Sequence, residues 1–481
     1  MLRSAVARAG AQRATFLRSF SRSAPVCAVA PPPKKQSKVT RKKEVKEKVK
    51  KGGMTHLKFG DAVRQLKYEN LAADLTGLGL AELSASDLQS ISSNVVIYNN
   101  HAEKTLKELG AFKKNQNHEL FSRPVSMVTE NTSKIHSEFI EKLASESAQN
   151  RLCLLGEKGA GKSTLVAQTQ ALLLSHYKGD VVLLHVDQAE KVVDGSSDYF
   201  YNPSLKKFHQ PMFTKRWIKK VRAANEAVFK KMPLTEDVSF VSKKEKHSLK
   251  KEKHTIYDFL TLNHEFGFYG PSNAFQFFVK QLQAHSSKFP VLVSIDNFNA
   301  LIRDPHTAYF HTDMRPVTLG DLEFGSFISL LVSGDLSFAK GGVMLSESKD
   351  LGECKTLRAG LRLEQPNPYE PAEKCDLDFA KQMTKNGGVR TFQVENLTKE
   401  QARGLLLFLD KVGVLQIREY PTKEIYKSLE ESAFAPGTTI NVGEYVRCQD
   451  REAQFERILQ LTYFASAGNP GRFLKINSLT F

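Results

Sequence analysis

The chain has 481 residues and a mass of 53.9 kDa, which is enough for about three domains and excludes a small disulfide-stabilised module. Hydrophobic residues make up 41% and charged residues 25%, the balance of an ordinary globular protein rather than of a disordered or fibrous one. No apolar run approaches the roughly 18 residues that a membrane-spanning helix needs. The sequence therefore predicts a soluble chain without a membrane span.

The net charge of +17 is distributed unevenly along the chain. Residues 1–53 contain 15 Lys and Arg against 2 acidic residues, and residues 204–254 contain 15 against 5. The rest of the chain is mildly acidic. We therefore expect two basic segments, rather than the whole surface, to make any contact with a polyanion such as RNA.

The N-terminal segment splits into two parts. Up to Ala30 it has five arginines, no lysine and no acidic residue, a composition typical of a mitochondrial transit peptide. The sequence Arg18-Ser19-Phe20-Ser21 predicts cleavage after Phe20, so that residues 1–20 are removed; an uncleaved basic tail is the alternative. Residues 21–120 are predicted to form a basic extension, whose Lys-rich run either orders on RNA or remains a solvated linker.

Residues 151–176 have the pattern of a strand, a glycine-rich loop and a helix, in that order. The loop matches G-x-x-x-x-G-K-[ST], in which backbone N–H groups surround phosphate oxygens at the positive end of the helix dipole. Lys162 is predicted to reach the β and γ phosphates and Ser163 to ligate Mg²⁺; a loop that no longer binds nucleotide is the alternative. The nucleotide-binding residues predicted here are Gly156, Glu157, Lys158, Gly159, Ala160, Gly161, Lys162, Ser163 and Thr164.

Two further apolar runs each end in an aspartate. Residues 181–186 are followed by Asp187 and residues 290–295 by Asp296, and runs this apolar fit the inner strands of a parallel sheet. Asp296 is the predicted second Mg²⁺ ligand, because an apolar strand delivers its carboxylate beside the loop. Asp187 is interpreted as a helix cap or loop carboxylate. Asn297 stands where ATPases of the AAA type have a water-orienting Glu, so hydrolysis is predicted to be slow or absent.

Several features follow these strands toward the C-terminus. A strand over residues 342–346 ends in Ser346, which either senses the γ-phosphate or simply starts a turn. Thr398 and Gln401 have the spacing of a capping box ahead of a helix over residues 402–409. Another helix, over residues 455–464, is ended by Gly-Asn-Pro, after which Arg472 is either an ordinary surface residue or a lid arginine that reaches a phosphate.

About a hundred residues separate the second strand from the third, so part of this segment, residues 196–260, is predicted to be an insertion. Basic residues alternate there with aromatic residues, a pattern suited to RNA backbone contact with occasional base stacking. An amphipathic helix with a solvated lysine face, and with Phe213, Trp217 and Val221 as its buried stripe, is equally compatible. The candidate RNA contacts are Lys206, Lys207, Lys215, Arg216, Lys219, Lys220, Lys243 and Lys244.

These pieces together resemble one family. The presequence, the loop at residues 156–163, the segment Ile-Asp-Asn-Phe-Asn-Ala-Leu at 295–301, the helix opened at Thr398 and the Gly-Asn-Pro at 468–470 are similar to those of the death-associated protein 3 family. Members of that family are the P-loop component of the small subunit of the mitochondrial ribosome. The resemblance runs over roughly residues 120–475.

The resemblance implies a fold. We expect an α/β class protein with an AAA-like P-loop NTPase core and a parallel sheet at residues 121–350, and a mainly helical, lid-like region at 351–481. It also implies bound GTP or GDP with Mg²⁺, with the segment near Arg123 running past the base. No N-K-x-D element that would read guanine is present, so ATP remains open.

The resemblance further implies a structural role in the mitochondrial matrix, within the head of the small ribosomal subunit near the subunit interface. The expected partners are mitochondrial rRNA and neighbouring small-subunit proteins, with a contact to the large subunit. Residual GTPase or ATPase activity is the most that is expected, and no catalytic residue is assigned. Two alternatives remain: a free matrix P-loop NTPase that acts as a remodeller or signalling switch, and an RNA-binding module with a vestigial P-loop.

Overall fold

The computed structural model describes residues 75–113, 116–203, 205–242, 245–262, 274–365, 374–415 and 451–478, with a few isolated positions between 366 and 373. Residues 68–481 group as one compact unit. The predicted transit peptide, the Lys-rich run of the N-terminal extension and the two RNA candidates Lys243 and Lys244 lie outside the described residues. Within the described residues, no helix has the length and apolar character that crossing a membrane requires.

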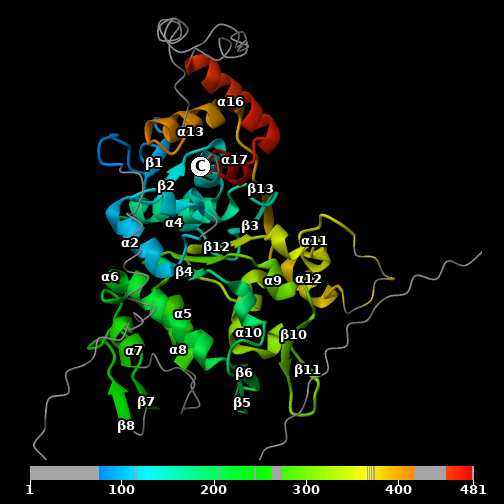
Figure 1. Ribbon diagram of the computed structural model, residues 1–481. Helices are drawn as coiled ribbons and strands as arrows, with labels where there is room; N and C mark the ends of the chain where they lie inside the picture. The colour runs from blue at the N-terminus through cyan, green and yellow to red at the C-terminus, as the bar shows by residue number, and fades with distance from the viewer. Residues whose placement is uncertain are drawn as a thin grey trace, which may run out of the picture. The chain divides into compact units, whose positions relative to one another are not determined.

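A parallel sheet of five strands forms the centre of this unit (Figure 1). Its strands lie in the order β13-β3-β12-β9-β4, and every neighbouring pair is parallel. The strands are β3 (Arg151–Leu155), β4 (Val182–Val186), β9 (Val291–Ile295), β12 (Gly341–Ser346) and β13 (Arg390–Gln393). The four strands predicted from apolar runs are confirmed, and so is the α/β class with a central parallel sheet.

The fifth strand comes from residues 351–481, the region predicted to be mainly helical, whose other described elements include α11, α12, α13, α16 and α17. β13 comes from that region and pairs with β3 at the edge of the sheet. Phe392 is its one buried residue, and Thr391 and Gln393 on either side are exposed. A four-residue strand with one buried side chain has too little periodicity for a sequence pattern to reveal it.

Helices cover both faces of the sheet (Figure 1). Alternate strand residues point to opposite faces, so Leu152 and Leu154 pack in a cluster with α4, whereas Cys153 packs in a second cluster with α5, α8 and α10. α4 (Lys162–His176) and α2 (Asn100–Leu109) belong to the first cluster. The second cluster holds α5 (Pro211–Ala224), α8 (Ala274–His285) and α10 (Glu323–Ser333).

The predicted boundary at residue 120 does not coincide with a structural one. β1 (Val95–Ile97) pairs antiparallel with β2 (Val125–Met127), and α2 packs against α4 and α5. Leu106 and Leu109 of α2 are buried in the same cluster as the leucines of α4. The described part of the predicted basic extension is therefore packed into the fold. The next helix, α3 (Glu130–Ile135), also packs against α4.

The predicted insertion at residues 196–260 forms two hairpins and a set of helices. β5 (Phe200–Asn202) pairs with β6 (Lys207–His209), and β7 (Val238–Ser242) pairs with β8 (Glu245–Leu249). α5, α6 (Glu226–Phe229) and α7 (Ile256–Leu262) pack on one another. Trp217 and Phe208 are buried in the core, so neither is available to stack on RNA bases as the aromatic pattern suggested.

The C-terminal region packs as a separate cluster at one edge of the sheet. α13 (Lys399–Lys411) begins with the predicted capping box of Thr398 and Gln401, which is confirmed. α16 (Arg451–Ser466) packs on α13, α17 (Pro470–Ser478) packs on α16, and all three share one apolar cluster. The remaining elements are α9 (Asn299–Ile302), α11 (Lys355–Gly360), α12 (Leu377–Met383) and a hairpin of β10 (His306–Phe310) and β11 (Pro316–Thr318).

Candidate nucleotide site

The glycine-rich loop joins β3 to α4 at the carboxyl edge of the sheet. Gly156, Gly159 and Gly161 have φ angles of 151°, 85° and 97°, a region that residues with a Cβ rarely adopt. Gly161 is the N-cap of α4, and its position has no side-chain cap. The first-turn N–H groups of the helix therefore point toward the loop without an intrahelical partner, which favours a bound anion there.

Lys162 folds back onto the loop. Its Nζ donates hydrogen bonds to the carbonyl oxygens of Gly156 and Glu157, each at 2.7 Å. Burial lowers the pKa of Lys162 below its usual value, and the nearby carboxylate of Glu347 acts in the opposite direction. The Lys162 ammonium is partly buried and, within the described residues, bonded only to neutral carbonyl oxygens. A phosphate is a charged acceptor and would form a stronger hydrogen bond with it.

Asp296 lies at the end of β9 and is almost completely buried. Its carboxylate accepts hydrogen bonds from the hydroxyl of Ser346 and from the N–H of Asn297, the latter at 3.1 Å, and the Ser163 hydroxyl lies close enough to lower its pKa. The ammonium of Lys113 pairs with its other oxygen. Burial alone would raise the pKa of Asp296, but Lys113, Ser346 and Ser163 outweigh it and hold the pKa below the usual value.

Three residues that the sequence assigned to this site therefore meet in space. Ser163 and Ser346 both contact the carboxylate of Asp296. Among the described residues, no group of three or more His, Cys, Asp or Glu side chains could hold a metal ion alone. Any Mg²⁺ held here would need phosphate oxygens and waters to complete its six ligands, which is how Mg²⁺ usually binds beside a nucleotide.

Sequence reasoning missed Lys113 and Glu347. Lys113 lies in the segment predicted as a basic extension, and its distance along the chain from Asp296 leaves no local pattern that could link them. Glu347 follows β12, is buried, and pairs with Lys349 at 3.1 Å. A Glu directly after a predicted strand end was visible in the sequence, and its position beside Ser346 is the signal that could have identified it.

The Gly-Asn-Pro turn at the start of α17 packs directly on the loop. Asn469 Nδ2 donates to the Lys158 carbonyl at 3.0 Å, and the N–H of Gly471 donates to the Gly159 carbonyl at 2.9 Å. A Cβ on Gly159 would lie 2.6 Å from Asn469 Oδ1, so this contact requires glycine. The turn was interpreted as a helix stop, and the structure adds that it holds the loop against the C-terminal helices.

The charged side chains on and next to the loop make contacts at the surface. Arg472 is exposed, and its nearest acidic partner is Glu157, with 3.8 Å between the charged groups. Lys158 pairs with Asp350 at 2.5 Å. Asn297 donates to Glu190 at 3.3 Å, so the residue after Asp296 is used in a surface contact. Ala160 and Thr164 line a cavity beside the loop.

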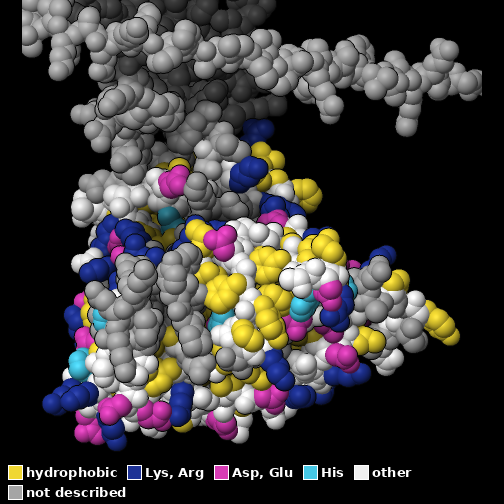
Figure 2. Space-filling view, turned by 90° about the horizontal axis from the view of Figure 1, so that it is seen from below, with side chains coloured by type: hydrophobic (Ala, Val, Ile, Leu, Met, Phe, Trp, Pro, Cys, Tyr) yellow, Lys and Arg dark blue, Asp and Glu magenta, His cyan; other side chains and the backbone are white. Residues whose placement is uncertain are grey.

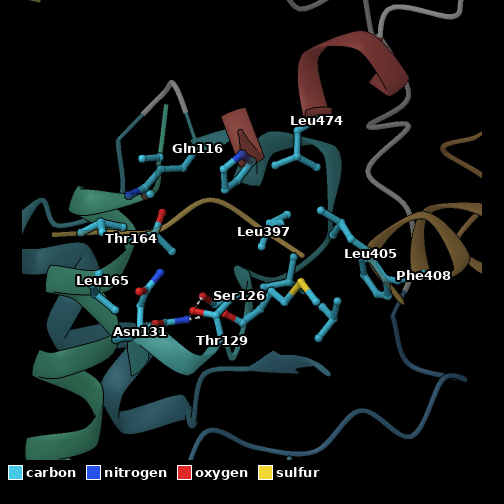
Figure 3. A pocket seen from close by; sticks show the side chains of 18 of the residues that line it. Gln116, Ser126, Thr129, Asn131, Thr164, Leu165, Leu397, Leu405, Phe408 and Leu474 are labelled. Atoms are coloured by element: carbon cyan, nitrogen blue, oxygen red, sulfur yellow. Dashed lines mark hydrogen bonds between the residues drawn. The ribbon is translucent and has the colours of Figure 1, made fainter. Parts of the chain in front are cut away.

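That cavity has a volume of about 120 Å³ and lies between the loop, β2 and the C-terminal helices (Figure 3). Figure 3 shows Thr164 and Gln116 at one end of it and the apolar side chains of Leu405 and Phe408 at the other. The Nε2 of Gln116 and the Nδ1 of His118 are buried, and neither has a hydrogen-bond partner among the described residues. Apolar walls with a few unsatisfied polar atoms are typical of a site for a planar organic ligand.

Residues on both sides of Arg123 line this cavity, whereas Arg123 is not among its lining residues. Phe121, Val125 and Ser126 form part of the wall. Arg123 instead donates to Glu103 at 3.0 Å and to the Tyr98 carbonyl at 2.8 Å, so it ties α2 to the segment before β2. Arg123 itself therefore lies outside the cavity wall, and the passage of this segment beside a bound base stays a prediction.

The candidate RNA residues separate into two groups. Lys206 is exposed in the β5–β6 turn, and Lys215, Arg216 and Lys219 lie on the exposed side of α5. Lys207 instead donates to the Gly320 carbonyl and to Ser326 Oγ, the latter at 3.1 Å, and holds the hairpin to α10. Lys220 pairs with Asp187 at 2.7 Å, which makes Asp187 a loop carboxylate, as one of its two interpretations had it.

A second surface lies near the two hairpins β5–β6 and β10–β11. Seen from that side, Figure 2 shows hydrophobic side chains gathered in the middle of the face and charged side chains around them. The exposed large side chains of these hairpins and their flanks are Tyr199, Phe200, Tyr201, Phe310 and Met314. Exposed aromatic groups in one place are typical of a surface that contacts another macromolecule.

Comparison with known proteins gives concordant results. Residues 126–444 match the family described as mitochondrial ribosomal death-associated protein 3. The small ribosomal subunit protein mS29 of Schizosaccharomyces pombe is 25% identical over 289 residues, which cover 57% of this chain and 56% of that protein. The family match includes the glycine-rich loop, Asp296 and Ser346 and takes in most of the described chain. This chain belongs to the mitochondrial ribosomal death-associated protein 3 family.

Proposed function

We propose that this chain is a structural component of the small subunit of the mitochondrial ribosome, and that its glycine-rich loop holds a purine nucleotide, with GTP favoured over ATP. Family membership makes it a protein of the mitochondrial matrix, as the arginine-rich N-terminal segment predicts. The observation that carries the proposal is the combination of the family match over residues 126–444 with the loop geometry inside it.

The sheet supports a P-loop NTPase core. In chain order its strands lie fifth, first, fourth, third and second across the sheet, so the connection from β12 to β13 passes over β3. Open α/β sheets bind ligands beyond the carboxyl ends of their strands, at the point where the strand order reverses. The glycine-rich loop follows β3 at that point.

The bound nucleotide would lie along the loop with its base in the cavity. The loop N–H groups and Lys162 would contact the phosphates, and Ser163 and Asp296 lie at the position where a P-loop protein places its metal ion. Gln116 Nε2 would donate a hydrogen bond to the base edge, and His118 Nδ1 would accept one, because its Nε2 already donates to Gln116 Oε1. The side chains of Glu157, Lys158 and Arg472 form surface ion pairs. These residues would therefore contact the nucleotide through their backbone, or only after their side chains leave these pairs.

A structural role for the nucleotide follows from what surrounds the loop. α17 bonds to the loop through Asn469 and Gly471, and the cavity wall includes Leu405 of α13 and Leu474 of α17. A ligand there would contact the core and the C-terminal helices together. It would stabilise their packing by RT ln(1 + [L]/Kd), which is about 2.7 kcal/mol when the ligand is at 100 times its Kd.

The basic side of α5 and the aromatic surface near the two hairpins are the surfaces proposed for partners. Lys215, Arg216 and Lys219 would contact rRNA phosphates, and the exposed aromatic side chains would contact neighbouring small-subunit proteins. A hollow of about 390 Å³ runs beside α5, and Lys191, Arg216, Lys219 and Lys220 line it together with the acidic Glu108 and Asp187. A contact with the large subunit is part of the same proposal.

Sedimentation of lysed mitochondria tests this function. The chain should migrate with the small ribosomal subunit, and mass spectrometry of the recovered particles should detect GTP or GDP that is absent after a Lys162→Ala substitution. A chain found at the top of the gradient even at low salt would instead favour a free matrix NTPase. Normal assembly of the Lys162→Ala variant with no change in stability would favour an RNA-binding module with a vestigial loop.

A further inference from the structure

The cation next to Asp296 is a side chain of the chain itself. Lys113 Nζ pairs with Asp296 Oδ2, while Oδ1 accepts from Ser346 and from the Asn297 N–H. Both oxygens of the predicted metal ligand are therefore engaged. Because the Ser163 hydroxyl lies close to the same carboxylate, the ammonium lies near the two residues to which Mg²⁺ binding was assigned.

This ion pair is shielded from water. The side chain of Asp296 is 3% exposed and that of Lys113 is 24% exposed. Breaking an ion pair that is buried to this extent is costly, because it leaves a charged group without its partner. Mg²⁺ would have to displace the ammonium and also give up some of its own water ligands, which it does reluctantly.

The segment that carries Lys113 also forms part of the cavity wall. The N–H of Lys113 donates to Gln116 Oε1 at 3.1 Å, and the same oxygen shares a hydrogen bond with His118 Nε2 at 2.9 Å. Gln116 and His118 line the cavity. Moving Lys113 away to admit Mg²⁺ would therefore disturb the polar side of the cavity as well.

We propose that the Lys113 ammonium takes the place of Mg²⁺ at Asp296, so that this chain holds a nucleoside triphosphate or diphosphate with little dependence on a divalent cation. The inference rests on the nucleotide site proposed above and assigns the cation that pairs with Asp296. Lys113 supplies one positive group at Asp296, in addition to the one that Lys162 supplies on the loop. Mg²⁺ becomes the occupant of this position only when Lys113 is removed.

Affinity measured with and without Mg²⁺ tests the assignment on the full chain. The Kd for fluorescent GTP and ATP analogues is determined in excess Mg²⁺ and again in EDTA. The unmodified protein should show a change of less than about threefold between the two conditions. Lys113→Met should bind at least about tenfold more weakly in EDTA and recover when Mg²⁺ is added.

A matched control is available at the neighbouring strand end. Lys220 pairs with Asp187 after β4, as Lys113 pairs with Asp296 after β9, but Asp187 is 21% exposed and Asp296 only 3%. Lys220→Met should bind nucleotide as the unmodified protein does in both conditions. Lys113→Arg keeps the positive charge and should retain more binding in EDTA than Lys113→Met.

Two results would overturn the assignment. One is a loss of about tenfold or more when Mg²⁺ is removed from the unmodified protein, a measurement that needs no variant and so does not depend on whether a variant folds. The other is Lys113→Met binding in EDTA as tightly as the unmodified protein. An absence of nucleotide binding under every condition would instead reject the nucleotide site itself, together with the role of Lys113 in it.

Discussion

Two neighbouring strands of the sheet each end in an aspartate that pairs with a lysine, yet the two pairs differ in almost everything else. Asp296 after β9 is 3% exposed and Asp187 after β4 is 21% exposed. Asp296 also accepts a hydrogen bond from Ser346 and lies close to Ser163 in the first turn of α4. The comparison shows that the same local motif becomes a candidate site only where the sheet order brings it beside the loop.

The position of each strand explains the difference. β9 and β12 are adjacent inside the sheet and β3 lies next to β12, so the ends of these three strands meet at one edge. β4 lies at the margin of the sheet, and Asp187 there meets α5. Burial of the first pair and exposure of the second predict very different energetic consequences when each is broken.

Replacement of each aspartate is expected to give the largest contrast. Asp296→Asn should lower the free energy of unfolding by about 3 kcal/mol, because it leaves the Lys113 ammonium beside a neutral amide in a dry site. Asp187→Asn should cost at most about 1 kcal/mol, because water and salt screen its pair. Urea denaturation of both variants measures the contrast, and equal losses would show that burial does not separate the two sites.

A histidine between the two pairs gives a pH-dependent test. His185 of β4 is fully buried, shares a hydrogen bond with Ser294 at 2.9 Å, and has its pKa lowered to about 4, mainly by burial. The unfolded chain takes up this proton near pH 6.5 and the folded chain only near pH 4, so stability falls as the pH drops through that interval. At pH 5 the loss relative to pH 7.5 should be about 2 kcal/mol from this residue.

The measurement for His185 compares two pH profiles. Urea midpoints of the unmodified protein and of His185→Gln are recorded from pH 7.5 to pH 5. The variant should be less stable than the unmodified protein at pH 7.5. Its stability should fall less as the pH drops, because it lacks the imidazole that takes up a proton on unfolding, so the two curves should converge. Parallel curves would mean that His185 does not resist protonation in the folded chain.

The contact between the loop and α17 should have a smaller effect. Asn469→Ala removes the hydrogen bond to the Lys158 carbonyl and the one that the Arg472 N–H donates to Asn469 Oδ1, with an expected loss of about 1–2 kcal/mol. Asn396→Ala is the control, because Asn396 bonds to the Ala467 carbonyl of the same turn at 3.2 Å but is exposed. Its loss should stay below about 0.5 kcal/mol in the same urea experiment.

The nucleotide should also distinguish these two asparagine variants. If the ligand connects the loop to the C-terminal helices, the stabilisation that GTP adds to the unmodified protein should shrink in Asn469→Ala and persist in Asn396→Ala. Thermal unfolding with and without GTP measures it. An unchanged GTP effect in Asn469→Ala would separate the ligand site from the turn.

The smallest expected effect concerns the exposed lysines of α5. Lys219→Met should reduce the slope of log affinity for small-subunit rRNA against log salt by about 1, since one phosphate contact is lost. Lys220→Met should reduce it by less, because Asp187 already neutralises that ammonium. Titrations over a range of salt concentrations measure both slopes, and two equal slopes would remove the reason for distinguishing the two lysines.

Local sequence determined the parts of this protein whose causes lie within one short segment. The strand, loop and helix at residues 151–176 follow from an apolar run, glycines that adopt positive φ and helical spacing, and the capping box at Thr398 follows from two residues three positions apart. The family resemblance also depended on such contiguous pieces. Each of these features is stabilised mainly by residues close in the chain, so the pattern was sufficient.

Only the tertiary structure decided which distant residues meet at the edge of the sheet. Lys113 reaches Asp296, and Asn469 reaches the loop, across separations along the chain that no local pattern spans. β13 joins the sheet through one buried side chain, Phe392. These contacts exist because parallel strands bring their carboxyl ends to one edge and because buried polar groups must find partners there, and both requirements apply to the folded chain as a whole.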